Sequence, residues 1–172
     1  GVLTTHLHSD GTHAEELAMI NPGSHGGKHL GAEQFGFPDP SVLGEVFITQ
    51  TMLDDGLLYP NMNGQLVFKT AVTKFPEVIM EALAKTGLTP ADIDMLIPHQ
   101  ANLRISQFVQ KTLRLPDHKV YNNIQKYGNT TAASIPIALC EAWEAGLVKD
   151  GDLVCLAAFG SGFTWGSALL RW

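Results

Sequence analysis

The sequence has little positive charge and no long run of like charges. Its 11 Lys and Arg residues are outnumbered by 17 Asp and Glu residues, so the formal net charge is -6. A protein that binds along the phosphate backbone needs a basic excess on its surface, and nucleic acid is therefore not an expected partner. Any basic docking surface must be local.

Long hydrophobic segments and cysteines are also scarce. A membrane-spanning helix needs about 18 consecutive apolar residues; no such run and no signal peptide is present, so we expect no membrane partner. The two cysteines, Cys140 and Cys155, both lie in apolar segments. This favours reduced, buried thiols in a cytoplasmic protein over a disulfide.

The 172 residues are 45% hydrophobic, which is enough for one globular domain with a good core. Glycine and proline are frequent between about residues 20 and 60, and this predicts a loop-rich insertion within that domain. A strand pattern begins directly at Val2. We therefore expect the chain, residues 1–172, to be the second half of a larger fold.

Apolar periodicity predicts an alternation of strands and helices along the chain. Strands are predicted at residues 2–8, 93–97, 120–121, 153–159 and 164–171, and helices at 63–85, at 130–145 and from His99 to about Leu115, with a single helical turn at 89–92. The helix after His99 is expected to turn Leu103, Phe108, Val109 and Leu113 toward the core. The order predicts βαβ units with a terminal hairpin, and so an α/β half-domain with helices on both faces of a mixed sheet.

Three of the predicted strands end in polar or glycine-rich turns. His99 follows the apolar run 95–98, Asn129 stands at the head of a helical pattern, and Gly160-Ser161-Gly162 follows the strand at 153–159. Ligands in open α/β sheets gather beyond the carboxyl ends of strands, so we expect the three turns to converge on one site. Singly, each has an ordinary interpretation as a structural histidine, a helix cap or a hairpin turn.

Jointly, these turns carry motifs that are specific in their order. The motifs are Pro98-His99-Gln100-Ala101-Asn102, Gly128-Asn129-Thr130-Thr131-Ala132-Ala133-Ser134 and Phe159-Gly160-Ser161-Gly162-Phe163-Thr164-Trp165-Gly166. They resemble the carboxyl-terminal half of ketoacyl-ACP synthase III, the thiolase-fold enzyme that starts bacterial fatty acid synthesis. The resemblance runs along the whole chain except near residues 20–60. It implies a thiolase-like layered α/β fold.

The activity implied by this resemblance is an acyltransferase reaction, the decarboxylative Claisen condensation of acyl-CoA with malonyl-ACP to give 3-ketoacyl-ACP. It implies no cofactor and no metal. Loss of the malonyl carboxylate puts negative charge on the thioester oxygen, so the site needs neutral hydrogen-bond donors aimed at that oxygen. The resemblance assigns this catalytic role to His99 and Asn129.

Further roles follow from the resemblance. The backbone N–H of Ser161, which replaces a glycine of the family, would contribute to a second oxyanion hole, and Phe159 would form a wall of the active site. Lys69, Arg104 and Lys111 match positions that face the acidic acyl carrier protein, although each is equally well interpreted as a solvated helix residue. Asn102 would contact the pantetheine arm.

The nucleophilic cysteine of the family lies upstream of the position equivalent to Gly1. We therefore expect the chain's own amino-terminal half to supply it, in an enzyme that is a homodimer when complete. An alternative is a non-catalytic thiolase-like module that binds CoA or a carrier protein. A third is a metallohydrolase, because His6-Leu7-His8-Ser9-Asp10 has a metal-ligand spacing.

Overall fold

The computed structural model describes residues 1–19, 48, 50–56 and 58–172. The chain divides into two compact units, each described here by itself. The larger contains Gly1–Ser9, Phe68–Gly160 and Thr164–Trp172, and the smaller contains Asp10–Val67 and Ser161–Phe163. Most of the loop-rich insertion predicted near residues 20–60 lies outside the described residues. No helix in the described ranges is long and apolar enough to cross a membrane.

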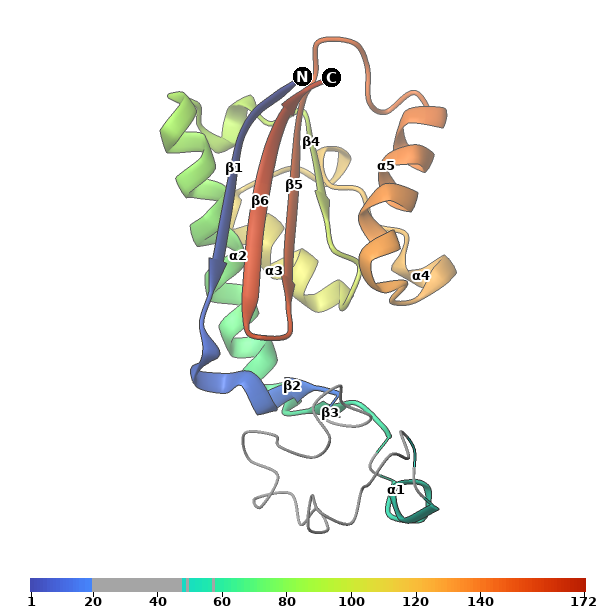
Figure 1. Cartoon of the computed structure of the whole chain (residues 1–172). Coiled ribbons are helices and arrows are strands. Elements are labelled where there is room, and N and C mark those ends of the chain that lie inside the picture. The colour runs from blue at the N-terminus through green and yellow to red at the C-terminus, as the bar shows by residue number, and fades with distance from the viewer. Residues whose placement is uncertain (20–47, 49, 57) are drawn as a thin grey trace. The chain divides into compact units, whose positions relative to one another are not determined.

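Four strands form the sheet of the larger unit (Figure 1). In spatial order they are β1 (Val2–Ser9), β6 (Thr164–Arg171), β5 (Leu153–Gly160) and β4 (Met95–Pro98). β4 and β5 are parallel, whereas β6 is antiparallel to both β5 and β1. The sequence predicts all four strands. The strand predicted at 120–121 is instead a single parallel bridge between Val120 and Leu96.

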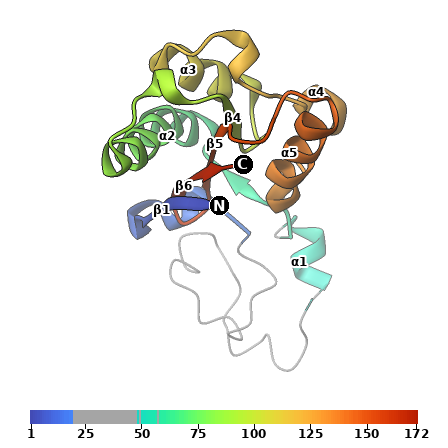
Figure 2. The ribbon, with the colours of Figure 1, turned by 90° about the horizontal axis from the view of Figure 1, so that it is seen from above.

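Helices lie on both faces of this sheet, as the sequence predicts (Figure 2). Most of α2 (Gly64–Thr86) and all of α3 (Leu103–Leu113) lie on one face, and α4 (Ile124–Tyr127) and α5 (Ser134–Glu144) lie on the other. Short 3₁₀ helices are found at Pro90–Asp92, Asp117–Lys119 and Thr131–Ala133. The first of these is the single turn predicted at 89–92.

The central strands are buried because helices cover them on both sides. On one face of the sheet, Met95 and Ile97 of β4 pack with Ala138 and Ala142 of α5. On the other face, the Ser167 hydroxyl of β6 donates a hydrogen bond to the Val78 carbonyl of α2, with a distance of 2.8 Å. All four residues of β4 are buried, so the strand that leads to His99 lies in the core.

The smaller unit contains short elements. They are a 3₁₀ helix (Gly11–Glu16), β2 (Leu17–Ala18), α1 (Gln50–Asp54) and β3 (Asn61–Met62). β2 and β3 form an antiparallel pair. Asp10 caps the 3₁₀ helix, because its side chain accepts a hydrogen bond from the Thr12 amide at 2.9 Å.

Candidate active site

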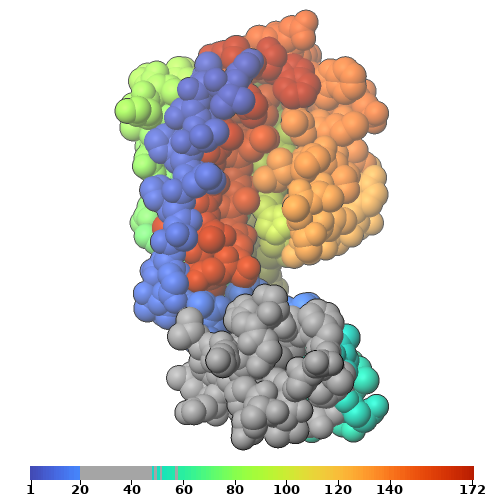
Figure 3. Space-filling view, viewed as in Figure 1, coloured from blue at the N-terminus to red at the C-terminus, as the bar shows by residue number. Residues whose placement is uncertain are grey.

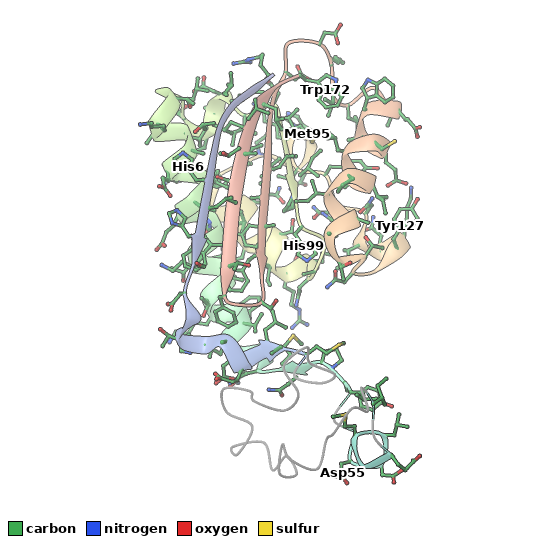
Figure 4. All side chains as sticks on the ribbon, in the orientation of Figure 1. His6, Asp55, Met95, His99, Tyr127 and Trp172 are labelled. Atoms are coloured by element: carbon green, nitrogen blue, oxygen red, sulfur yellow. The ribbon has the colours of Figure 1, made fainter. Side chains whose placement is uncertain are left out.

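His99 directly follows the buried strand β4 (Figure 4). Its amide donates to the Ala157 carbonyl of β5 at 2.8 Å, so the sheet fixes the backbone at this residue. The side chain is half-buried, and burial lowers the pKa of the imidazole below its ordinary value. Near neutral pH the ring is therefore an uncharged group that can donate one hydrogen bond.

The His99 ring contacts the first residue of α5. Its Nδ1 lies 2.6 Å from the Ser134 hydroxyl oxygen, which also accepts a hydrogen bond from the Gln100 amide at 3.2 Å. Ser134 is 2% exposed, so its hydroxyl group is shielded from water. The sequence motif that contains Ser134 does not predict this contact, because the contact joins residues that are 35 positions apart.

Asn129 lies in the turn that leads into α5. Its side-chain oxygen accepts a hydrogen bond from the Thr131 amide at 2.9 Å, which fixes the orientation of the carboxamide. Thr131 has a φ of 51°, a strained value for a β-branched residue. The side chain of Asn129 is exposed, and among the described residues its Nδ2 donates to no acceptor. Asn129 and His99 thus both lie at the amino-terminal end of α5.

Gln100 ties the end of β4 to the start of α4. Its side chain is 2% exposed. The side-chain oxygen accepts hydrogen bonds from the amides of Asn123 and Ile124 at 2.9 and 3.2 Å, and the side-chain nitrogen donates to the Pro98 carbonyl at 2.7 Å. No sequence pattern predicts these bonds. They fix the turn after β4 relative to the segment that precedes Asn129.

A second group of hydrogen bonds holds this segment to α5. Donors to the Glu141 carboxylate are Asn123 and Tyr127 at 2.7 Å, Lys126 at 2.9 Å and Tyr121 at 3.3 Å. The bonds from Asn123, Tyr127 and Lys126, of which that from Asn123 has the largest effect, lower the pKa of Glu141 to about 2. The carboxylate is therefore ionised at neutral pH and anchors residues 121–127, of which Tyr127 is labelled in Figure 4.

Phe159 lies on the other face of the sheet from α5. Ala157 pairs with Ser167, which contacts α2, and strand alternation places Phe159 on that same side. Its ring stacks on Trp165 with a centroid distance of 6.4 Å, and it is 6% exposed. The role of Phe159 as a wall of the site thus remains a prediction from the resemblance.

Ser161 lies in the three residues that join β5 to β6, and it is exposed. Residues 161–163 belong to the smaller unit. Within that unit the Asp10 amide donates to the Phe163 carbonyl at 2.8 Å, and the rings of His13 and Phe163 lie 5.7 Å apart. The backbone donor expected at Ser161 likewise remains a prediction.

The helix α3 presents a basic and apolar surface. Arg104 and Lys111 are exposed on it, and so are Leu103 and Phe108, by 39% and 45%. The prediction that Leu103 and Phe108 face the core is therefore wrong. Val109 and Leu113 are buried, as the sequence predicts.

The other two residues expected to contact the carrier protein or its pantetheine arm, Asn102 and Lys69, lie on α3 and α2. Asn102 caps α3, because its side-chain oxygen accepts a hydrogen bond from the Arg104 amide at 2.9 Å. Lys69 is exposed on the first half of α2. Both helices lie on the same face of the sheet (Figure 2).

Neither cysteine has the setting of a nucleophile. Cys155 is fully buried, and burial raises its pKa to about 12. Cys140, which is predicted to lie in the core, is exposed on α5; that prediction is wrong because α5 turns this position away from the sheet. The negative charge of Glu144 raises the pKa of Cys140, so this thiol is protonated as well.

The histidines of the predicted metal-ligand spacing, His6 and His8, lie on β1 beside α2. His6 and His8 both contact the carboxylate of Glu81 on α2, at 3.1 and 2.6 Å. Among the described residues, no group of three or more His, Cys, Asp or Glu side chains is placed to hold a metal ion. The metallohydrolase alternative therefore has no ligand set in this part of the chain.

Comparison with known proteins gives a consistent picture. The sequence model for the 3-oxoacyl-[acyl-carrier-protein (ACP)] synthase III C-terminal family matches residues 83–172. The whole chain aligns with the beta-ketoacyl-[acyl-carrier-protein] synthase III of Rhodospirillum centenum, at 46% identity over 45% of that protein. The corresponding synthase of Caldanaerobacter subterraneus is 42% identical over 46% of its length. The chain thus spans less than half the length of these relatives.

Solved structures agree with these alignments. The crystal structure of 3-oxoacyl-[acyl-carrier-protein] synthase III from Aquifex aeolicus matches with a TM-score of 0.77 and 38% identity. The match covers 99% of this chain and 44% of that one. The mixed sheet with helices on both faces is therefore part of a thiolase fold.

Proposed function

This chain belongs to the ketoacyl-ACP synthase III family through its carboxyl-terminal region, and we propose that it forms the decarboxylating part of a condensing acyltransferase. The complete enzyme would join an acyl-CoA primer to malonyl-ACP and give 3-ketoacyl-ACP. The relatives that carry this name support the reaction class. The proposal extends to a cytoplasmic enzyme that is a homodimer when complete.

The observation that carries the proposal is the presence of two neutral donors at the amino-terminal end of α5. Decarboxylation of the malonyl group leaves its bonding electrons on the adjacent carbon, and the charge is shared with the thioester oxygen. His99, uncharged because it is half-buried, and Asn129, with its Nδ2 directed away from the Thr131 contact, can donate to that oxygen. A cationic lysine in their place would hold the carboxylate that must leave.

The carbanion then needs an acyl group to attack. In the proposed cycle, a cysteine thiolate first takes the acyl group from acyl-CoA and releases CoA, and the malonyl carbanion later displaces that thiolate. Cys140 and Cys155 both have raised pKa values and do not suit this step. We assign the nucleophile to the amino-terminal half of the enzyme, with the backbone N–H of Ser161 and the ring of Phe159 beside it.

The exposed surface of α3 fits a carrier protein. Carrier proteins are acidic, and Arg104 and Lys111 place positive charge on this helix while Leu103 and Phe108 add apolar area. Lys69 extends the positive charge on α2. Asn102, at the start of α3, is the residue that we assign to the pantetheine arm.

The assignment of His99 and Asn129 is tested by separating the two half-reactions. In the enzyme assembled from this chain and its amino-terminal half, we expect His99→Ala and Asn129→Ala to slow malonyl decarboxylation by about 10²–10³-fold, because each removes one donor. Transfer of the acyl group from CoA to the cysteine should persist, because these donors do not serve that step. Release of labelled carbon dioxide from radiolabelled malonyl-ACP measures decarboxylation, and the mass of the protein measures acyl transfer.

Matched controls are His118→Ala, in the 3₁₀ helix Asp117–Lys119, and Asn61→Ala, in β3, which both remove exposed side chains. Both half-reactions should survive in these controls. Equal loss of both half-reactions in His99→Ala or Asn129→Ala would contradict the role. Retention of decarboxylation in both variants would instead favour the non-catalytic binding module.

A further inference from the structure

The contact between Ser134 and His99 lies at the junction of β4 and α5. The Ser134 hydroxyl oxygen is 2.6 Å from Nδ1 of His99 and 3.2 Å from the amide nitrogen of Gln100. Ser134 is 2% exposed, so water does not compete for its hydroxyl group. The hydroxyl hydrogen must therefore find its acceptor among the protein atoms.

The Gln100 amide carries one hydrogen and can only donate. It thus fills one acceptor site of the Ser134 oxygen. The hydroxyl hydrogen of Ser134 needs an acceptor of its own, since a buried hydroxyl without one is costly. Among the described residues, Nδ1 of His99 is the acceptor that lies within reach. If Nδ1 carried a hydrogen, the hydroxyl hydrogen would have no partner.

Nδ1 of His99 therefore accepts, and the single ring proton of the neutral imidazole is on Nε2. From this count we infer that Ser134 is a positioning residue, which holds His99 as the Nε2–H tautomer and fixes the plane of its ring. Burial lowers the pKa of His99, so the ring stays neutral, as the count requires. In the described part of the chain, Nε2 has no hydrogen-bond partner.

The consequence for catalysis rests on the proposed function. A neutral histidine can stabilise the malonyl oxyanion through one nitrogen only, and that nitrogen must carry the proton. With Nδ1 engaged by Ser134, Nε2–H is the one donor the ring can offer. Gln100 takes part through its backbone, because its amide N–H donates to the Ser134 oxygen and cannot accept the hydroxyl hydrogen.

The proton assignment can be tested without any assay of activity. The two ring nitrogens of a neutral histidine have different ¹⁵N shifts, depending on which carries the proton. In ¹⁵N-histidine-labelled protein near neutral pH, we expect His99 to show a protonated Nε2 and an unprotonated, hydrogen-bonded Nδ1. The signals of the seven histidines are assigned by their loss in single variants such as His99→Ala. A protonated Nδ1 in the wild-type protein would overturn the inference.

The positioning role is tested by Ser134→Ala, with Ser134→Thr as the variant that keeps the hydroxyl. Ser134→Ala should change the ¹⁵N shift of Nδ1, admit a population with Nδ1 protonated and slow malonyl decarboxylation. This decrease in the decarboxylation rate should be smaller than that of His99→Ala, which removes the donor itself and should cost about 10²–10³-fold. Ser134→Thr should restore both measurements.

The matched control is Ser167→Ala, which removes a buried serine that bonds to α2. An unchanged His99 spectrum in Ser134→Ala, with decarboxylation equal to that of Ser167→Ala, would overturn the positioning role. If the spectra behave as expected but neither Ser134→Ala nor His99→Ala affects decarboxylation, the inference stands and the proposed function fails. If Ser134→Ala does not fold, the wild-type spectrum and Ser134→Thr still decide the proton assignment.

Discussion

Burial of the His99 ring determines the pH range in which the proposed donor is neutral. The pKa of this imidazole is lowered, because the charged form loses more hydration energy than the neutral form on burial. The cation would also deprive the Ser134 hydroxyl of its acceptor. Both effects act in the same direction and favour the neutral ring.

We therefore expect malonyl decarboxylation to stay constant as the pH falls to about 6.5, the ordinary histidine value. The rate should decline only at lower pH, as His99 takes up its second proton and begins to hold the malonyl carboxylate. Initial rates of the assembled enzyme across this range provide the measurement, with His118→Ala as a control that should give the same profile. An inflection from His99 above this value would contradict the account.

At the level of single residues, the sequence predicts which residues precede and follow the strands but not what they contact. His99 and Asn129 are identified by their motifs. The partner of His99 is Ser134, and their contact depends on how α5 packs on β4, which no local pattern encodes. The group of donors around Glu141 is missed for the same reason.

Among the elements, α3 presents both basic and apolar side chains to solvent. It begins at the Asn102 cap, four residues beyond the end of β4, and carries Arg104 and Lys111 on its exposed surface. Two apolar side chains, Leu103 and Phe108, are exposed beside them. A helix surface that is both basic and apolar is better explained by docking of an acidic partner than by exposure to solvent alone.

Reversal of one charge tests this surface. We expect Arg104→Glu to raise the KM for malonyl-ACP much more than the KM for malonyl-CoA, because only the carrier protein brings an acidic surface. Lys85→Glu, at the end of α2, makes the same change at another exposed position and should leave the ratio of the two KM values unchanged. Added salt should reduce the difference for Arg104→Glu. An unchanged ratio in Arg104→Glu would make it an ordinary solvated residue.

The elements themselves are well predicted where their pattern is strong. The strands at 153–159 and 164–171 match β5 and β6 closely, because alternation and flanking turns mark both ends. Helix faces are less predictable. Phe108 and Cys140 are apolar and were expected in the core, but both point away from the sheet, since the buried side of a helix depends on what packs against it.

For the molecule as a whole, the sheet is covered unevenly. Glu81 of α2 contacts His6 and His8, so Leu7, between them, faces the other side of the sheet. Val2 faces that side too, because it pairs with Leu170, which packs toward α5, and Val2 and Leu7 are 63% and 84% exposed. Figure 3 shows β1 and β6 forming an open surface beside α5. Exposed apolar area of this kind is typical of a face that another polypeptide covers.

This surface and the length of the relatives support an enzyme completed by an amino-terminal half. The chain spans less than half of the synthases that it matches. Its own thiols have raised pKa values, one through burial and one through the charge of Glu144. We therefore propose that this chain promotes decarboxylation and that another segment of the enzyme carries the acyl group.

The most direct test is to locate the acyl group after incubation with acetyl-CoA, by mass spectrometry of each polypeptide. We expect no acetylation of Cys140 or Cys155, either in this chain by itself or in the assembled enzyme, and a single acetyl group on the amino-terminal half. His99→Ala should be labelled to the same extent, because acyl transfer does not need this donor. Robust acetylation of Cys140 or Cys155 would contradict the account.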